Sequence, residues 1–255
     1  MYRSIFIFGF ILLSLGGCRQ SEDLSNQSNL MAQTQDIEKR SSSKLIDILV
    51  LVDQEDSDNF NGVNEAKIDH FISVTNRIYQ NSNLDIRFQI KKIEPYRLGK
   101  CGSKELLYAI QRDGAVERLR NDVKADLVIA YRKYANDGIC GIAFINDRYK
   151  REYGYAHVSL ECVSTTTAHE IGHMMGLDHQ ENRSIPYAHG YGIEGEFHTI
   201  MAYGEYYRRK DQMYNYSSPQ LECNGYVCGV EKELENGADA VSALRVGSEK
   251  IVVFN

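Results

Sequence analysis

The sequence predicts an α+β protein in which a mixed, twisted β-sheet is flanked by helices and followed by a loop-rich region. Between residues 44 and 160, short apolar runs of strand length alternate with segments of helical periodicity, an order typical of a sheet covered by helices. Beyond residue 180 the chain is rich in Gly, Tyr and Asn, with one further helical segment. The apolar and charged fractions, 43% and 25%, are those of an ordinary globular protein.

The first half of this region supports the assignment element by element. The nearly continuous apolar run Leu45–Val52 predicts a strand that is buried on both faces. An apolar stripe at helical spacing predicts a helix over Glu65–Gln80, and alternating apolar and polar residues predict a half-buried strand at Asp85–Ile93. Residues 104–124 have a helical pattern that is interrupted near Gly114.

Shorter elements complete the expected fold. Strands are predicted at Asp126–Tyr131, Ile139–Ile145 and Tyr155–Leu160, and the C-terminal helix is predicted near Ala238–Arg245. We therefore expect residues 44–255 to form one domain whose C-terminal part is a loop-rich subdomain.

The N-terminus predicts export. A basic start at Arg3 is followed by the apolar run Ile5–Leu15, which is too short to span a bilayer, and then by small residues. The stretch Leu15–Cys18 resembles a bacterial lipobox, in which the cysteine is acylated and becomes the mature N-terminus. The alternative is a plain signal peptide with an incidental cysteine. Under the first interpretation, a lipid on Cys18 anchors the protein to the membrane without threading it through.

The location and the tether are inferred from the same region. Arg19 comes directly after Cys18, and by resemblance to bacterial sorting signals this favours the outer membrane. The expected location is the cell envelope, on its periplasmic or surface face, or the exterior after release. Residues 19–43 are predicted to be a flexible tether, because they are rich in Ser, Asn, Gln and charge and have little apolar surface to bury.

Export allows the cysteines to form disulfides, but five remain after Cys18 is set aside, so one thiol should stay free. Cys223 and Cys228 close a short loop and form a natural pair. The pairing among the other three is open. Cys140 and Cys162 flank a plausible hairpin, which would leave Cys101 as the free thiol.

The stretch Ala168–His179 carries the chemistry. His169 and His173 are four residues apart, so on a helix both imidazoles project from one face and can bind one ion. Glu170 can reach a water on that ion. Gly176 permits a sharp turn through a positive φ angle, which brings His179 back as the third ligand. Three neutral imidazoles leave a fourth position for water, the arrangement of a catalytic zinc.

This stretch matches the HExxHxxGxxH signature of the metzincins at every fixed position, and Thr199–Tyr203 resembles the methionine turn of that family. Other stretches resemble the reprolysin-like (adamalysin-like) branch and its bacterial relatives: Ala125–Val128, Cys140–Ala143, Thr199–Gly204, Tyr216–Pro219 and Gly237–Ala240. The resemblance covers about residues 44–246. It implies a zincin/metzincin catalytic domain with the activity of a zinc metalloendopeptidase.

Two positions depart from the reprolysin pattern. Gln180 follows the third histidine, where reprolysins usually have Asp. Tyr203, two residues after the turn methionine Met201, resembles a tyrosine of astacins and serralysins that can reach the zinc. Two interpretations of Tyr203 stay open: a catalytic phenol, or a packed aromatic whose hydroxyl caps a nearby carbonyl.

The resemblance implies hydrolysis of protein or peptide substrates. Zinc lowers the pKa of its bound water from about 15.7 toward about 7 and polarises the scissile carbonyl. Glu170 is expected to accept a proton from the water and then pass it to the leaving amine. Backbone groups near Gly141–Ile145 would hold the substrate as an added antiparallel strand. Met201 would form an apolar floor under the histidines.

The other histidines have simpler expected roles. His70 is predicted to be solvated and His157 to be a hydrogen-bonded residue of the partial core. His189 and His198 lie between the motif and the methionine turn, where either could face substrate. Lys100-Cys101-Gly102 is similar to the cysteine segment that blocks zinc in some latent metzincins, but its place inside the domain favours a structural or free thiol for Cys101.

The net charge of -6 and the absence of a basic stripe argue against nucleic-acid binding. Two rivals to a peptidase remain. One is an adhesive or host-binding surface lipoprotein with weak or no turnover, although the intact Glu170 argues against it. The other is hydrolysis of a non-peptide substrate at the same zinc. The protein is expected to be a monomer.

Overall fold

The computed structural model describes residues 43–54, 63–181, 184–208 and 211–254. The predicted signal peptide, Cys18 and all but the last residue of the predicted tether lie outside the described residues. Ser43–Asn255 forms one compact unit. In the described part of this unit, no helix is both long and apolar enough to cross a membrane.

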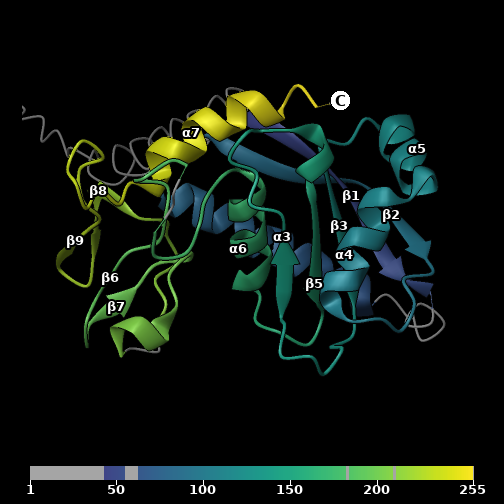
Figure 1. Ribbon diagram of the computed structural model, residues 1–255, viewed down its shortest axis with the longest axis horizontal. Helices are drawn as coiled ribbons and strands as arrows, with labels where there is room; N and C mark the ends of the chain where they lie inside the picture. Colours follow the sequence, from purple (N-terminus) through teal and green to yellow (C-terminus); the bar gives the residue numbers. More distant parts are fainter. Residues whose placement is uncertain (1–42, 55–62, 182–183, 209–210, 255) are drawn as a thin grey trace, which may run out of the picture. The chain divides into compact units, whose positions relative to one another are not determined.

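A five-stranded mixed sheet is the centre of this unit (Figure 1). Its order is β2-β1-β3-β5-β4, in which β4 alone runs antiparallel to its neighbour and lies at the edge. The strands are β1 (Lys44–Asp53), β2 (Ile86–Tyr96), β3 (Leu127–Arg132), β4 (Gly141–Ala143) and β5 (Tyr155–Ser159). The predicted mixed sheet is confirmed.

Helices cover both faces of the sheet, as the alternating pattern predicted (Figure 1). One face packs against α3 (Val63–Asn81), α6 (Thr165–Met174) and α7 (Ala240–Ile251). The other face packs against α4 (Ser103–Arg112) and α5 (Gly114–Val123). Alternate residues of β1 enter the two cores: Ile48 and Val50 face the first, and Leu49 and Leu51 face the second. The predicted burial of this strand on both faces is therefore confirmed.

The interruption predicted near Gly114 is a helix boundary. Asp113 has an extended backbone, and its carboxylate accepts a hydrogen bond from the Ala115 N–H, which caps α5. The C-terminal helix is longer than predicted, because it starts at Ala240 and continues to Ile251. The edge strand β4 is shorter, spanning Gly141–Ala143 and not Ile139–Ile145.

The loop-rich region beyond residue 180 contains short ladders that the sequence did not predict. They are β6 (Gly192–Ile193) with β7 (Phe197–His198), and β8 (Ser218–Cys223) with β9 (Tyr226–Cys228). Two turns of 3₁₀ helix are η1 (Arg151–Tyr153) and η2 (Gly204–Tyr207).

The disulfides agree with the preferred pairing. Cys140 is bonded to Cys162 and Cys223 to Cys228, while Cys101 is a free cysteine. The first bond joins the residue before β4 to the loop that leads into α6. The second closes the β8–β9 hairpin.

Candidate metal centre

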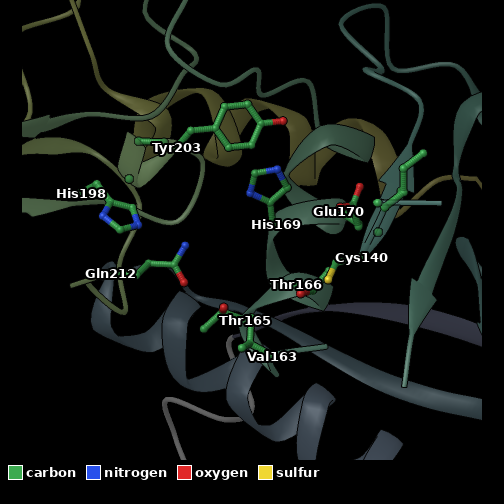
Figure 2. A pocket seen from close by; sticks show the side chains of 14 residues that line it. Cys140, Val163, Thr165, Thr166, His169, Glu170, His198, Tyr203 and Gln212 are labelled. Carbon is green, nitrogen blue, oxygen red and sulfur yellow. The ribbon is translucent and has the colours of Figure 1, made fainter. Parts of the chain in front are cut away.

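Helix α6 carries His169, Glu170 and His173, and it lies beneath the loop of the methionine turn (Figure 2). The helix ends at Met174, and Gly176 then takes a φ of +93°. The N–H of Leu177 donates a hydrogen bond to the Gly172 carbonyl at 2.9 Å, which closes the turn. The chain is thereby redirected so that His179 faces the helix, as the glycine predicted.

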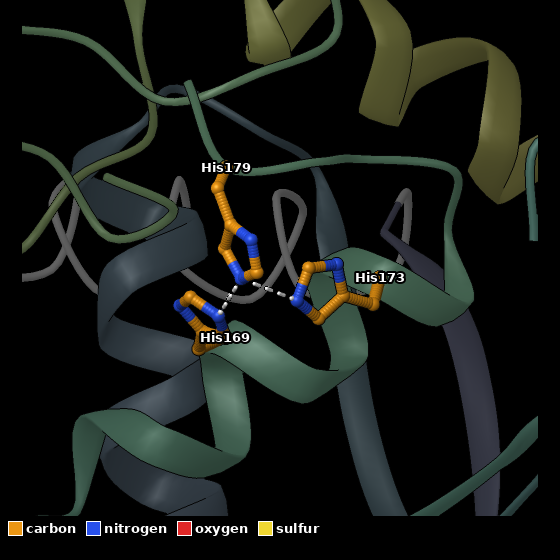
Figure 3. A group of neighbouring side chains, drawn as sticks. All are labelled: His169, His173 and His179. Carbon is orange, nitrogen blue, oxygen red and sulfur yellow. Dashed lines mark hydrogen bonds between the residues drawn. The ribbon is translucent and has the colours of Figure 1, made fainter. Parts of the chain in front are cut away.

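The three imidazoles converge on one point (Figure 3). Nε2 of His179 lies 3.1 Å from Nε2 of His169 and 3.1 Å from Nε2 of His173. Nitrogens about 2.0–2.1 Å from one tetrahedral zinc would be about 3.3–3.4 Å apart. The spacing of the nitrogens therefore fits a shared ion, and His169, His173 and His179 lie close enough to hold one.

The Nδ1 atoms of His169 and His173 show which tautomer each imidazole adopts. Nδ1 of His169 lies 2.8 Å from the carbonyl oxygen of Ile200, and Nδ1 of His173 lies 2.9 Å from that of Leu177. Because a carbonyl can only accept, both Nδ1 atoms carry the hydrogen and both Nε2 lone pairs face inward. Burial also lowers the pKa of His169 to about 4 and lowers the pKa of His173 and of His179. Neutral imidazole is the form that binds zinc.

Glu170 lies between α6 and the edge strand β4. Its side chain is buried, and burial raises its pKa to about 8. Its Oε2 atom has no hydrogen-bond partner in the described part of the chain. A Cβ atom at Gly141 would lie 2.6 Å from Oε1, so only glycine lets β4 pass this close to the carboxylate.

Met201 packs against α6 at Gly172, the residue before His173. It is fully buried, and a Cβ atom at Gly172 would lie 2.5 Å from its sulfur. The preceding residue, Ile200, supplies the carbonyl that fixes His169. The methionine turn thus packs directly against α6 and orients one of the three histidines.

Tyr203 covers the site from the solvent side. Its ring centroid lies 4.1 Å from that of His179, while 45% of the residue is exposed. Its hydroxyl makes no hydrogen bond to any described residue, so the alternative role of capping a carbonyl is not observed. Burial raises the pKa of this phenol, and the charge of nearby Glu170 contributes to the shift.

A cavity of about 440 Å³ opens beside His169 and Glu170 (Figure 2). It lies between β4, the start of α6 and the loops around the methionine turn. Its walls are Gly138, Ile139, Cys140, Gly141, Val163, Thr165, Thr166, His169, Glu170, His198, Ala202, Tyr203, Gly204 and Gln212.

Comparisons with known proteins agree with this geometry. A family model described as metallo-peptidase family M12B, reprolysin-like, matches residues 65–180, from α3 to just past the third histidine. A peptidyl-Asp metalloendopeptidase of Pseudomonas aeruginosa is 29% identical over 251 aligned residues, covering 84% of this chain and 41% of that protein. A peptidyl-Asp metalloendopeptidase of Xanthomonas campestris is 24% identical over 208 residues, covering 76% and 49%. By these matches the chain is similar to the reprolysin-like metallopeptidases.

A solved structure has a similar fold. It is described as the structure of a chaperone-substrate complex, and it matches with a TM-score of 0.71 at 25% identity, over 84% of this chain and 39% of that one. The chain spans less than half the length of the two curated relatives. Zinc is the metal of the M12 metallopeptidases, and the neutral three-histidine donor set fits it.

The structure brings the residues of the zinc motif together. Of the other histidines and Cys101, it places only one in the wall of the cavity. His198 lines the cavity, whereas His189 does not and places its Nδ1 2.7 Å from the Gly190 carbonyl. His70 is exposed, and His157 is buried with Nδ1 3.1 Å from the Ala130 carbonyl, as expected for both. Cys101 lies outside the walls of this cavity.

Three polar side chains of the cavity, Thr165, Thr166 and Gln212, were not predicted from the sequence. The run of threonines shortly before the zinc motif could have drawn attention to Thr165 and Thr166. No pattern in the sequence distinguishes Gln212, because the loops fold it back onto the start of α6.

Proposed function

We propose that this chain is a zinc-dependent endopeptidase that hydrolyses protein or peptide substrates with a metal-activated water. The observation that carries the proposal is the position of Glu170. Its buried carboxylate lies beside His169 on α6 and against the backbone of β4. A base, a metal-binding group and a strand edge thus meet at one place.

Bound zinc would supply a more acidic water and a Lewis acid for the scissile carbonyl. Glu170 would accept a proton from the attacking water and deliver it to the leaving nitrogen. The Tyr203 hydroxyl, above His179, would donate a hydrogen bond to the oxygen that becomes negative in the transition state. Nδ1–H of His169 and of His173 would stay on their carbonyl acceptors throughout.

The edge strand β4 is suited to hold an extended peptide. The Cys140 carbonyl accepts a hydrogen bond from the Ser159 N–H at 2.8 Å, so Cys140 and Ser159 form a hydrogen-bonded pair of the antiparallel ladder. By alternation, the N–H and C=O groups of Gly141 and Ala143 point away from β5. A substrate strand that pairs with them would pass over Glu170.

The substrate preference is a finer part of the proposal. Both curated relatives are named peptidyl-Asp metalloendopeptidase. We extend this preference to the present chain, so that an aspartate next to the cleaved bond would favour hydrolysis. Support comes from the cavity beside Glu170, whose walls, as far as the structure describes them, contain polar side chains and no other carboxylate.

A metal and activity assay tests the proposal. Purified protein should contain about one zinc per chain and cleave casein. Glu170→Ala should keep the zinc and lose the cleavage, whereas alanine at His169, His173 or His179 should lose the zinc. Zinc-loaded protein that binds other proteins without cleaving any would favour the adhesive lipoprotein instead. Cleavage by Glu170→Ala at near wild-type rates would refute the mechanism.

A further inference from the structure

We propose that the cavity beside the three histidines binds an acidic side chain of the substrate, and that neutral hydrogen-bond donors in the cavity walls recognise it. The donors are Thr165, at the start of α6, and Gln212, and His198 lines the same cavity. This inference rests on the proposed peptidase function and adds to it the groups that recognise the substrate. Among the described residues, no arginine or lysine takes part in this recognition.

The start of α6 forms one wall of the cavity. The helix has ten residues, Thr165–Met174, and its N-cap residue Ser164 makes no side-chain capping hydrogen bond. Its first turn contains no acidic residue. The partial positive charge at this helix N-terminus is therefore not offset by a carboxylate in its first turn. Such an end attracts an anion that reaches it.

Thr165 adds an independent observation. The residue is 6% exposed, yet it lines the cavity, and its hydroxyl makes no hydrogen bond within the described part of the chain. Figure 2 shows its hydroxyl and the amide of Gln212 on the same side of the site, facing one another below His169. The Thr165 side chain is thus largely buried, and its hydroxyl is free to bond a group in the cavity. A ligand group that enters between Thr165 and Gln212 would supply a partner.

Gln212 and His198 are held side by side by backbone hydrogen bonds. The N–H of His198 donates to the Asp211 carbonyl at 3.3 Å, and the N–H of Met213 donates to the His198 carbonyl at 2.8 Å. The amide nitrogen of Gln212 lies 3.4 Å from the Ile200 carbonyl, which already accepts the closer Nδ1–H of His169 at 2.8 Å. A contact of 3.4 Å is weak. The Gln212 amide can therefore turn toward a carboxylate at little cost.

The charges around the cavity favour the same ligand. Among the described residues, its walls contain no lysine or arginine, and their one carboxylate is that of Glu170, on the side of the histidines. An aspartate side chain would meet a hydroxyl, an amide and a helix end, all of which can donate. An asparagine has the same shape but lacks the charge that the helix end attracts. The wild type should therefore prefer Asp to Asn by about 10-fold in kcat/KM.

The test uses peptides that contain a single aspartate in an alanine-rich background. Mass spectrometry locates the cleaved bond relative to the aspartate, and matched peptides then carry Asn, Ala or Lys at that position. The readout is the ratio of kcat/KM for each pair of peptides, measured within each variant. A general loss of activity does not change this ratio.

Three variants and one control decide the inference. Thr165→Val keeps the shape but removes the hydroxyl, and should lower the Asp-to-Asn ratio about 5-fold or more, whereas Thr165→Ser should keep it. Gln212→Glu adds a negative charge and should shift the preference from Asp to Lys. Gln220→Glu makes the same chemical change at an exposed position of β8, outside the cavity, and should leave the ratio unchanged.

A binding measurement separates this inference from the proposed function. Zinc-loaded Glu170→Ala protein is titrated with the labelled Asp and Asn peptides by fluorescence anisotropy, and tighter binding of the Asp peptide supports the inference. If the wild type cleaves no peptide, the proposed function fails. The binding titration then still tests whether the cavity prefers the Asp peptide. Equal affinity for both peptides, or ratios that Thr165→Val and Gln212→Glu leave unchanged, would overturn the inference.

Discussion

The phenol ring of Tyr203 lies against the imidazole of His179, with the ring centroids 4.1 Å apart and the planes at 33°. A ring packed in the protein core would be buried, but Tyr203 is 45% exposed. Its position is therefore set by one of the three metal-binding histidines and by the methionine turn. This relationship favours the catalytic interpretation of the tyrosine, and it leads to the first prediction.

Tyr203→Phe should impair turnover and leave stability unchanged. The variant keeps the ring on His179, and the hydroxyl has no partner in the described part of the chain to lose. A donor to the developing oxyanion contributes about 2.7–4 kcal/mol, so kcat and kcat/KM should both fall about 100-fold with KM almost constant. Tyr206→Phe is the control, since Tyr206 is 70% exposed and lies outside the cavity walls. Wild-type turnover in Tyr203→Phe would refute the role.

Gly141→Ala should displace the carboxylate of Glu170. The added methyl would lie 2.6 Å from Oε1 and 2.7 Å from Cγ2 of Thr166, so one of these groups must move. Misplacement of a catalytic group by about 1 Å can cost about 100-fold in rate. We expect a loss of at least about 10-fold in kcat with zinc retained. Gly114→Ala is the control, because its methyl would come no closer than 3.5 Å to Arg118.

Zinc removal should lower the melting temperature. A ligand present at about 100 times its Kd stabilises the folded state by about 2.7 kcal/mol. For a domain of this size that corresponds to about 5–10 °C. Differential scanning fluorimetry with a chelator and with added zinc measures the shift. His179→Ala should show no shift, because only two of the three converging Nε2 atoms remain. An unchanged melting temperature of the wild type on chelation would contradict a bound ion.

Stability should depend on acid pH through Asp113. The Tyr96 hydroxyl donates to its carboxylate at 2.6 Å, and this bond, with the Ala115 N–H, lowers the pKa of Asp113. A lowered pKa in the folded state means that the stabilisation is complete above the unfolded value, about 3.9, and is lost as the pH falls through the folded pKa. Tyr96→Phe should therefore cost about 1 kcal/mol at pH 7 and less below about pH 3.9.

Thermal unfolding of the wild type and of Tyr96→Phe, at pH 7 and below about pH 3.9, shows whether the cost of the substitution falls in acid. The gap in melting temperature should be about 2–4 °C at neutral pH and should narrow in acid. Tyr108→Phe, on the neighbouring helix α4, should show neither effect. A gap that widens in acid would show that Asp113 does not carry the pH dependence.

Cys18 should carry lipid after export. The lipobox Leu15–Cys18 motivates this prediction, although it lies outside the described residues. Mass spectrometry of the mature N-terminal peptide should find an acylated Cys18 at its start. Cys18→Ser should move the protein from the membrane fraction to the soluble fraction. Cleavage at another position, or an unmodified cysteine, would favour the plain signal peptide.

The sequence predicted the central elements well because their signals are local. The apolar run of β1 and the stripe of α3 determine which faces are buried. The spacing of His169 and His173 puts both on one face of a helix, and the turn at Gly176 brings His179 to them. The short ladders β6–β7 and β8–β9 were missed, since strands of two or three residues are too short for a periodic pattern. The edge strand β4 is shorter than predicted, because apolar side chains such as Ile139 and Ile145 continue the pattern beyond the residues that pair with β5.

Proximity in space was the least predictable property. The zinc ligands lie within eleven residues of one another, so their geometry can be inferred from one helix and one turn. The polar wall of the cavity combines Thr165 with His198 and Gln212 from loops more than thirty residues away. Only the packing of the methionine turn onto α6 brings these side chains together. No single-sequence pattern encodes that contact.

The Cys140–Cys162 disulfide joins the residue before β4 to the loop before α6, so the two walls of the cleft share a covalent link. Such a bond forms in oxidising compartments and not in the cytoplasm. For an exported chain, the wall that docks the substrate would be incomplete in the compartment where the chain is made. The producing cell would then be shielded from its own peptidase, because the cleft would reach its final shape only after secretion.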